Sequence, residues 1–151
     1  LHALRRHPRG AAVSEAGFEL DARLAADTVA VGDAALCRVL LMDDARWPWL
    51  ILVPRRTGLT ELHELRGEDR TRLWAESAAV AAALQAHGPP GKLNVAALGN
   101  VVAQLHLHHV LRQPGDPAWP GPVWGFGTRS PHPDAPAVAA AWRQRLAALF
   151  A

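Results

Sequence analysis

Residues 104–110 read Gln-Leu-His-Leu-His-His-Val, a short run in which histidines alternate with leucines. Side chains two positions apart on an extended strand share a face, so His106 and His108 are predicted to project side by side. Leu105 and Leu107 then lie on the opposite face, which we expect to enter the core. Two neighbouring imidazoles indicate either a nucleophile with its supporting residue or half of a metal site.

The composition indicates one globular domain. The chain has 151 residues, of which 50% are hydrophobic and 20% charged, and a chain of this length buries roughly two-thirds of its unfolded surface. The formal net charge is only +2, and no dense basic stripe runs along a predicted element, so no nucleic-acid partner is expected. No segment approaches the roughly 20 apolar residues of a membrane helix, so no membrane partner is expected either.

Cys37 is the only cysteine and lies in an apolar run, which excludes an intramolecular disulfide. We predict a buried, unreactive thiol and a reducing compartment, the cytoplasm. Residues 1–16 carry three arginines and are predicted to form an N-terminal tail, followed by one domain over residues 17–151.

Apolar runs predict two pairs of strands. Residues 35–42 and 49–53 are separated by a short turn signal, which favours an antiparallel hairpin. Residues 93–98 and 103–112 are predicted to form a second pair, joined through a Gly-Asn turn.

Helical spacing predicts a long helix over residues 68–87 and a C-terminal helix over residues 135–150. Residues 60–65 are predicted to form one helical turn, residues 21–27 a turn or short helix, and residues 113–133 a long irregular loop rich in Pro, Gly and Trp. The apolar face of the long helix is predicted to consist of Leu73, Val80 and Leu84, widened by Trp74 and Ala81. Helices that alternate with hairpins predict an α+β fold around an antiparallel sheet.

In this context, residues 104–110 resemble the signature of the histidine triad (HIT) superfamily, His-φ-His-φ-His-φ-φ, in which φ is apolar. The resemblance covers roughly residues 18–125, including the hairpin, the strand that ends in Val53-Pro54-Arg55 and the long helix. It is greatest to a bacterial branch described as dinucleoside polyphosphate hydrolase-like. It implies a HIT-like antiparallel sheet with one long helix and a C-terminal helix.

The resemblance also implies a reaction. The chain is expected to be a nucleotide hydrolase acting on nucleoside phosphates or dinucleoside polyphosphates through a nucleotidyl-histidine intermediate. His106 matches the middle histidine of the motif, which attacks the α-phosphorus. His108 matches the third histidine, which holds the nucleophile and stabilises charge on the phosphoryl oxygens. In the family, a backbone carbonyl near the last motif histidine accepts the proton of the nucleophile's other ring nitrogen.

Two departures from the family pattern bear on activity. Gln104 stands where the first histidine is usual, and it can hydrogen-bond a phosphate or leaving group but cannot deliver a proton. Trp49 stands where many members have a fourth, supporting histidine. Because a phosphate leaving group in an anhydride needs protonation least, polyphosphates are better candidates than phosphoramidates. The same departures leave open a second class, a nucleotide-binding protein with little or no turnover.

Further residues match family positions in the nucleotide site. Asn100 and Asn94 resemble residues that hydrogen-bond the phosphate or leaving group. Asp43 resembles the acid that holds the ribose hydroxyls, and Asp44 is the alternative because the hairpin is short. Each of these residues is also an ordinary turn or strand-end residue. Trp119 and Trp124 would either stack on a base or pack the Pro-rich loop.

Two further expectations concern metals and partners. His109 is predicted to point away from His106 and to pack in the core, and a metal site of His106, His108 and His109 has no further Cys or suitably placed acid to complete it. We therefore predict no resident metal or cofactor, and a divalent cation only as counter-ion of the substrate.

A homodimer is expected because HIT-like proteins commonly pair through the long helix and the sheet edge, unless the C-terminal helix covers Trp74.

Overall fold

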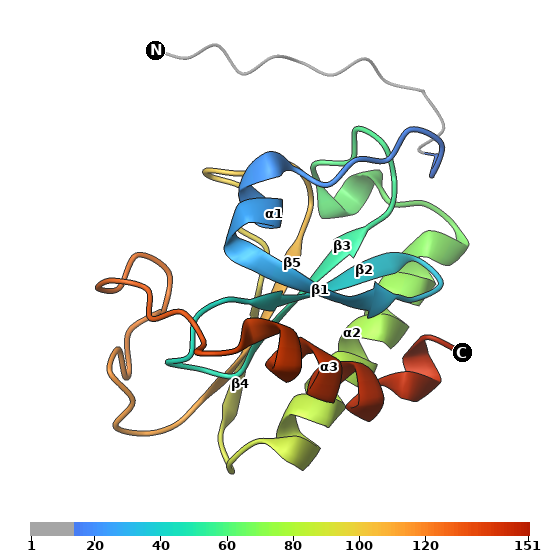
Figure 1. Cartoon of the computed structure of the whole chain (residues 1–151). Helices are drawn as coiled ribbons and strands as arrows, with labels where there is room; N and C mark the ends of the chain where they lie inside the picture. The colour runs from blue at the N-terminus through green and yellow to red at the C-terminus, as the bar shows by residue number, and fades with distance from the viewer. Residues whose placement is uncertain (1–13) are drawn as a thin grey trace, which may run out of the picture.

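A five-stranded antiparallel sheet forms the centre of the molecule (Figure 1). The computed structural model describes residues 14–151, so most of the predicted tail lies outside the described residues. In spatial order the strands are β1 (Thr28–Asp33), β2 (Cys37–Met42), β3 (Trp49–Pro54), β5 (Leu107–Arg112) and β4 (Lys92–Ala96). Every neighbouring pair is antiparallel. The predicted hairpin and the α+β class are therefore confirmed.

The sequence pattern missed β1, an edge strand. Only Val31 in it is buried, and its register against β2 shifts between Ala30 and Gly32. A bulge at that point breaks the alternation by which a half-buried strand is recognised. The strand exists because β2 supplies its hydrogen-bonding partner.

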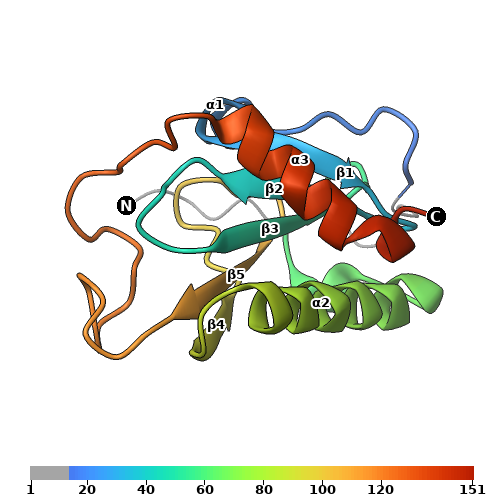
Figure 2. The same ribbon diagram turned by 60° about the horizontal axis from the view of Figure 1, so that its bottom comes forward.

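Two helices cover one face of the sheet. α2 (Glu68–His87) has the predicted bounds, and its end is marked by the Gly88 amide, which donates to the Leu84 carbonyl at 2.9 Å. The predicted C-terminal helix divides into α3 (Ala135–Arg145) and a 3-10 turn, η2 (Ala147–Leu149). The helices lie side by side in Figure 2 and enclose one core with the sheet. That core includes Leu105 and Leu107, as predicted.

The predicted buried face of α2 needs one correction. Trp74 is 55% exposed, whereas Glu76 and Ser77 are buried. The Glu76 carboxylate accepts hydrogen bonds from the backbone amides of Leu36 and Cys37 at 2.7 and 2.9 Å. Because Glu76 faces the sheet at the β1–β2 turn, Trp74, two positions earlier on the helix, faces away from the sheet. Cys37 is fully buried, as predicted.

The other face of the sheet carries a second apolar cluster, which joins Trp49, Ile51 and Val110 to residues of α1 (Ala22–Asp27) and of the loop over residues 113–133. That loop contains no helix or strand, as predicted, and residues 60–65 contain the single turn η1 (Leu62–Glu64).

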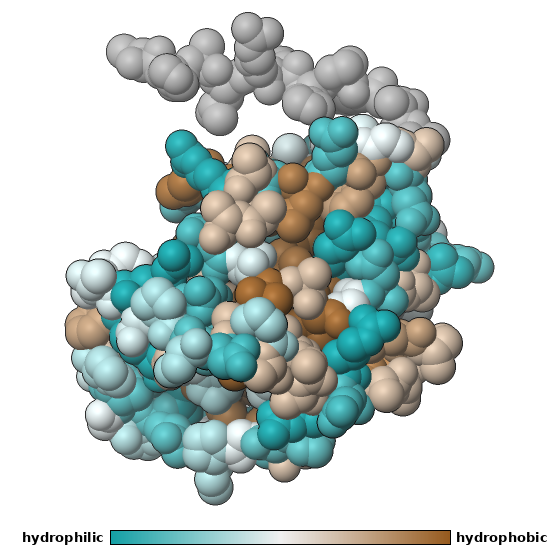
Figure 3. Space-filling view, in the orientation of Figure 1, coloured by the Kyte–Doolittle hydropathy of each residue, from teal (hydrophilic) through white to brown (hydrophobic). Residues whose placement is uncertain are grey.

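Figure 3 shows apolar side chains down the middle of one face, flanked by hydrophilic ones. No helix within residues 14–151 is long and apolar enough to cross a membrane.

Candidate active site

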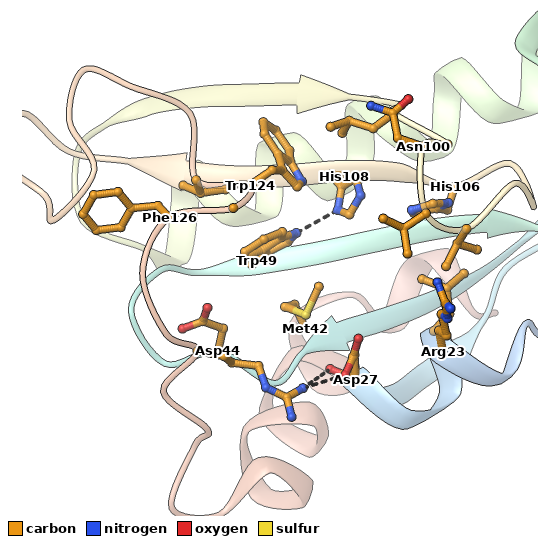
Figure 4. Close-up of a pocket in the computed structure, with 18 of the residues that line it drawn as sticks. Arg23, Asp27, Met42, Asp44, Trp49, Asn100, His106, His108, Trp124 and Phe126 are labelled. Carbon is orange, nitrogen blue, oxygen red and sulfur yellow. Dashed lines mark hydrogen bonds and ion pairs between the residues drawn. The ribbon is translucent and has the colours of Figure 1, made fainter. Parts of the chain in front are cut away.

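A cavity of about 760 Å³ lies on the face of the sheet opposite α2 and α3. Its walls come from five segments that are far apart in the sequence: α1, the β2–β3 hairpin, residues 98–102, the start of β5 and residues 123–129. His106 and His108 both line it, and Figure 4 shows their rings on the same side of the pocket. The predicted common face of these two histidines is confirmed.

His106 is held in one tautomer by the backbone. Its Nδ1–H donates to the carbonyl oxygen of Gln104 at 2.7 Å, and because a carbonyl only accepts, the proton must be on Nδ1. Nε2 therefore keeps its lone pair on the neutral ring. The family resemblance placed this carbonyl near the last motif histidine. Here it belongs to Gln104, at the first motif position and two residues before His106, which itself directly precedes β5.

His108 is held in the opposite tautomer by Trp49. The indole Nε1–H donates to His108 Nδ1 at 3.0 Å, and an indole nitrogen is only a donor, so His108 must carry its proton on Nε2. Burial, followed by the nearby rings of His106 and His109, lowers the pKa of His108 to about 3. The ring centroids of His106 and His108 are 4.8 Å apart. The site thus pairs a ring nitrogen that can attack with a neutral N–H donor.

Gln104 does not line the cavity, contrary to its predicted contact with the substrate. Its Oε1 accepts from the Asp21 amide at 2.9 Å and its Nε2 donates to the Glu19 carbonyl at 2.8 Å. Both ends of the side-chain amide are thus used to hold the segment that leads into α1.

Of the two predicted asparagines, only Asn100 lines the cavity. Asn94 lies on β4, and its Oδ1 accepts from Arg112 Nη1 at 3.0 Å. Arg112 is 1% exposed and forms an ion pair with Asp116 at 2.7 Å. The half-buried Asn94 therefore belongs to a network around the buried Arg112, outside the pocket, because its strand lies beyond β5 at the edge of the sheet.

Of the two acidic residues in the β2–β3 turn, Asp43 and Asp44, only Asp44 lines the cavity. Asp43 lies outside the cavity lining and accepts from the His132 amide at 2.8 Å and from its Nδ1 at 3.1 Å. Asp44, the alternative, lines the cavity and is 2% exposed. Its carboxylate pairs with Arg46 at 2.7 Å. The short turn after β2 directs consecutive side chains to opposite sides, so Asp44 and not Asp43 reaches the pocket.

His109 is fully buried on the helical side of the sheet. Its Nδ1–H donates to the Leu107 carbonyl at 3.1 Å, and Nε2 accepts from the Ser77 hydroxyl of α2 at 2.7 Å. The prediction that it points away from His106 is confirmed. Since it faces the other side of the sheet, the three-histidine metal site does not form, and no cluster of three metal-binding side chains exists among residues 14–151.

Some of the cavity wall was not predicted. Trp124, one of the two tryptophans considered, lines the cavity and packs edge-on against His108 with ring centroids 5.3 Å apart, whereas Trp119 does not line it. Arg23, Arg46 and Arg129 also line it. Nothing in the sequence distinguishes these arginines, because basic residues are scattered along the chain and only the fold brings the three together.

Comparison with known proteins agrees with this geometry. The family model of the HIT domain matches residues 23–115. Because that match spans more than half of the chain, the protein belongs to the HIT domain family, whose members are generally nucleotide-binding hydrolases or transferases. No match was found among curated proteins.

Solved structures of histidine triad proteins are similar along nearly the whole chain. The protein from Sinorhizobium meliloti 1021 is 43% identical with a TM-score of 0.82, covering 90% of this chain and 99% of that chain. The protein from Marinobacter aquaeolei VT8 is 48% identical with a TM-score of 0.78, covering 88% and 96%. The protein from Bradyrhizobium japonicum is 41% identical with a TM-score of 0.80, covering 89% and 98%.

Proposed function

We propose that this protein hydrolyses nucleoside phosphates or dinucleoside polyphosphates through a covalent nucleotidyl-His106 intermediate. The observation that carries the proposal is the hydrogen bond from His106 Nδ1–H to the Gln104 carbonyl. It makes Nε2 the nucleophilic nitrogen of a residue that lines a nucleotide-sized cavity.

In the first step, the Nε2 lone pair of His106 forms a bond to the α-phosphorus. The bond from that phosphorus to the bridging oxygen breaks, and the leaving group takes its electron pair. His108 stands beside the reacting atoms with its proton on Nε2. That N–H donates to a phosphoryl oxygen as negative charge develops on it, the role that preorganised donors have in such sites.

In the second step, water attacks the same phosphorus. The phosphorus–nitrogen bond breaks, the electron pair returns to His106 Nε2, and the mononucleotide leaves. The proton lost by water goes to the departing product or to solvent. His106 ends in its starting tautomer, because the Gln104 carbonyl holds the Nδ1 proton throughout.

The other end of the cavity fits a nucleoside. Phe126 lies at this end of the cavity (Figure 4), and Trp49 and Trp124 lie between it and His106, next to His108. Together the three rings provide aromatic surface for a base. Asp44 provides a carboxylate at the same end for ribose hydroxyls. We place the nucleoside at this end and the α-phosphorus at His106.

The test is incubation of the purified protein with diadenosine tetraphosphate, followed by chromatography of the nucleotide products. We expect many turnovers per protein molecule, and a nucleotidyl adduct detectable by mass spectrometry of the intact protein quenched at alkaline pH. Binding with at most stoichiometric product would instead support a nucleotide-binding protein. Absence of both product and binding would overturn the nucleotide function.

A further inference from the structure

We infer that Arg23 recognises the leaving group. Its guanidinium binds the phosphate oxygens of an anionic leaving group, and the His106 site therefore prefers phosphoanhydride substrates. This inference rests on the proposed function and adds to it the chemistry of the group that departs. Arg23 lies on α1, a short helix for which the sequence suggested no role.

The charges in the cavity are unequally compensated. Three arginines line it, and two of them already have carboxylate partners. Arg46 pairs with Asp44 at 2.7 Å, and Arg129 pairs with Asp27 at 3.1 Å. Both of these carboxylates also line the cavity. Arg23 is the remaining cation and adds one positive charge to a pocket whose other ionised pairs are neutral overall.

No hydrogen bond or ion pair holds the Arg23 guanidinium within the described residues 14–151. Residues 1–13 contain no aspartate or glutamate that could neutralise it. Arg23 is also exposed, so the guanidinium reaches a ligand without first breaking an ion pair. A guanidinium presents its donors in a rigid fork that matches two phosphate oxygens.

Gln104 brings Arg23 to the nucleophile. Its side-chain amide holds the backbone of Glu19 and Asp21, and the Asp21 carboxylate caps α1 by accepting from the Arg23 amide at 2.8 Å. Because Gln104 precedes His106 by two residues, these contacts fix the start of α1 beside the nucleophile. Gln104, which stands in place of the first motif histidine, thus positions the guanidinium-bearing residue Arg23.

Figure 4 agrees with this placement. Arg23 lies at the same end of the cavity as His106, whereas Phe126 and Asp44 lie at the other end. With the nucleoside at the far end, the leaving group on the α-phosphorus points toward Arg23.

The chemistry of the leaving group explains why Arg23 favours anhydride substrates. When the bond to the bridging oxygen breaks, a polyphosphate gains a negative charge that a guanidinium stabilises directly. An amine leaving group instead needs a proton. A guanidinium does not give up its proton in proteins and a side-chain amide has no acidic proton, so neither Arg23 nor Gln104 supplies one. The site therefore favours anhydrides over phosphoramidates.

The experiment compares two substrates that share adenosine 5′-phosphate and differ in the leaving group. One is diadenosine tetraphosphate, and the other is the p-nitrophenyl ester of adenosine 5′-monophosphate, whose leaving group needs no proton and carries no phosphate. A charged hydrogen bond is worth roughly 1.5–3 kcal/mol, so Arg23→Gln should lower kcat/KM for the tetraphosphate by about 10- to 100-fold. The value for the ester should change by less than about threefold, as for an ordinary surface substitution.

The matched control is Arg66→Gln, which removes the same charge from an exposed arginine outside the cavity lining. It should leave both kcat/KM values unchanged, and Arg23→Lys should retain part of the tetraphosphate activity. Equal losses on both substrates, or no loss on either, would overturn the role of Arg23 while leaving the hydrolase standing. Failure of the unsubstituted protein to hydrolyse either substrate would overturn the hydrolase itself.

A double-mutant cycle tests whether Gln104 acts by positioning Arg23. If Gln104 acts by placing Arg23, Gln104→Ala should lower tetraphosphate activity in the unsubstituted protein but add little in the Arg23→Gln background. Additive losses would show that Gln104 acts independently of Arg23.

Discussion

The indole Nε1 of Trp49 donates a hydrogen bond to Nδ1 of His108 over 3.0 Å, between two buried side chains on neighbouring strands. Trp49 stands where many family members have a histidine. In this chain the tryptophan does what an imidazole N–H would do, because it holds the proton of His108 on Nε2. The departure from the family pattern therefore preserves the His108 Nε2–H donor that the proposed mechanism uses.

Trp49→Phe should lower kcat by about tenfold, because Phe keeps the packing but removes the donor that selects the His108 tautomer. It also leaves Nδ1 of His108 buried without its partner. Trp49→His restores a ring N–H and should recover part of the loss. Steady-state kinetics with diadenosine tetraphosphate measures both, and circular dichroism checks the fold. Unchanged kcat in Trp49→Phe would show that the hydrogen bond does not set the tautomer.

His106→Ala should abolish both turnover and the nucleotidyl adduct, because it removes the atom that forms the covalent bond. His108→Ala should retain the adduct and lose about 100-fold in rate, since one positioned donor in such a site is worth roughly 3 kcal/mol. Intact-protein mass spectrometry and product chromatography distinguish the two variants. An adduct that persists in His106→Ala would place the nucleophile elsewhere.

His109→Val should destabilise the fold by about 1–3 kcal/mol, because the buried hydroxyl of Ser77 loses its hydrogen-bond partner. If His109 only packed against apolar groups, the same change would be neutral or slightly stabilising. Urea unfolding measures the loss. The double variant His109→Val with Ser77→Ala should recover much of it, because neither partner is then left unpaired. Activity per folded molecule should not change.

Stability should fall as the pH drops from about 6.5 toward 4. Burial lowers the pKa of His108 to about 3 and that of His109 to about 4, while both take up protons near pH 6.5 in the unfolded chain. The unfolded state then binds more protons across this window, and each histidine contributes up to about 1.4 kcal/mol per pH unit.

Urea unfolding at pH 7, 6, 5 and 4 tests this dependence. The His109→Val variant serves as the comparison, since one of the two histidines is absent and its slope against pH should be shallower. Parallel curves for the two proteins would contradict the assignment of His109 as a buried neutral histidine.

We expect a homodimer formed through α2 and the edge of the sheet. Trp74 is 55% exposed on α2 and Val95 is 44% exposed on the edge strand β4. α3 does not cover Trp74, so the intrachain alternative does not account for this apolar surface. Multi-angle light scattering at micromolar concentration should give about twice the chain mass of 16.2 kDa. Trp74→Glu should shift the protein toward monomer, and a monomeric parent protein would contradict the proposal.

Local patterns determined the parts of this fold that depend on neighbouring residues. The alternation of histidine and leucine decides which side chains share a face, because the period of an extended strand is a property of the backbone itself. The bounds of α2 follow similarly from acidic residues at its start and Gly88 after its end. Both features required only residues within a few positions of one another.

Only the tertiary structure decided which polar side chains reach the cavity. Asp44 rather than Asp43 lines it, and Asn100 rather than Asn94, because the turn after β2 and the strand order orient these side chains. Gln104 contacts a backbone 83 residues away in the chain, at Asp21. Contacts over such separations leave no local period in the sequence, since either partner is an ordinary residue until the sheet brings the two together.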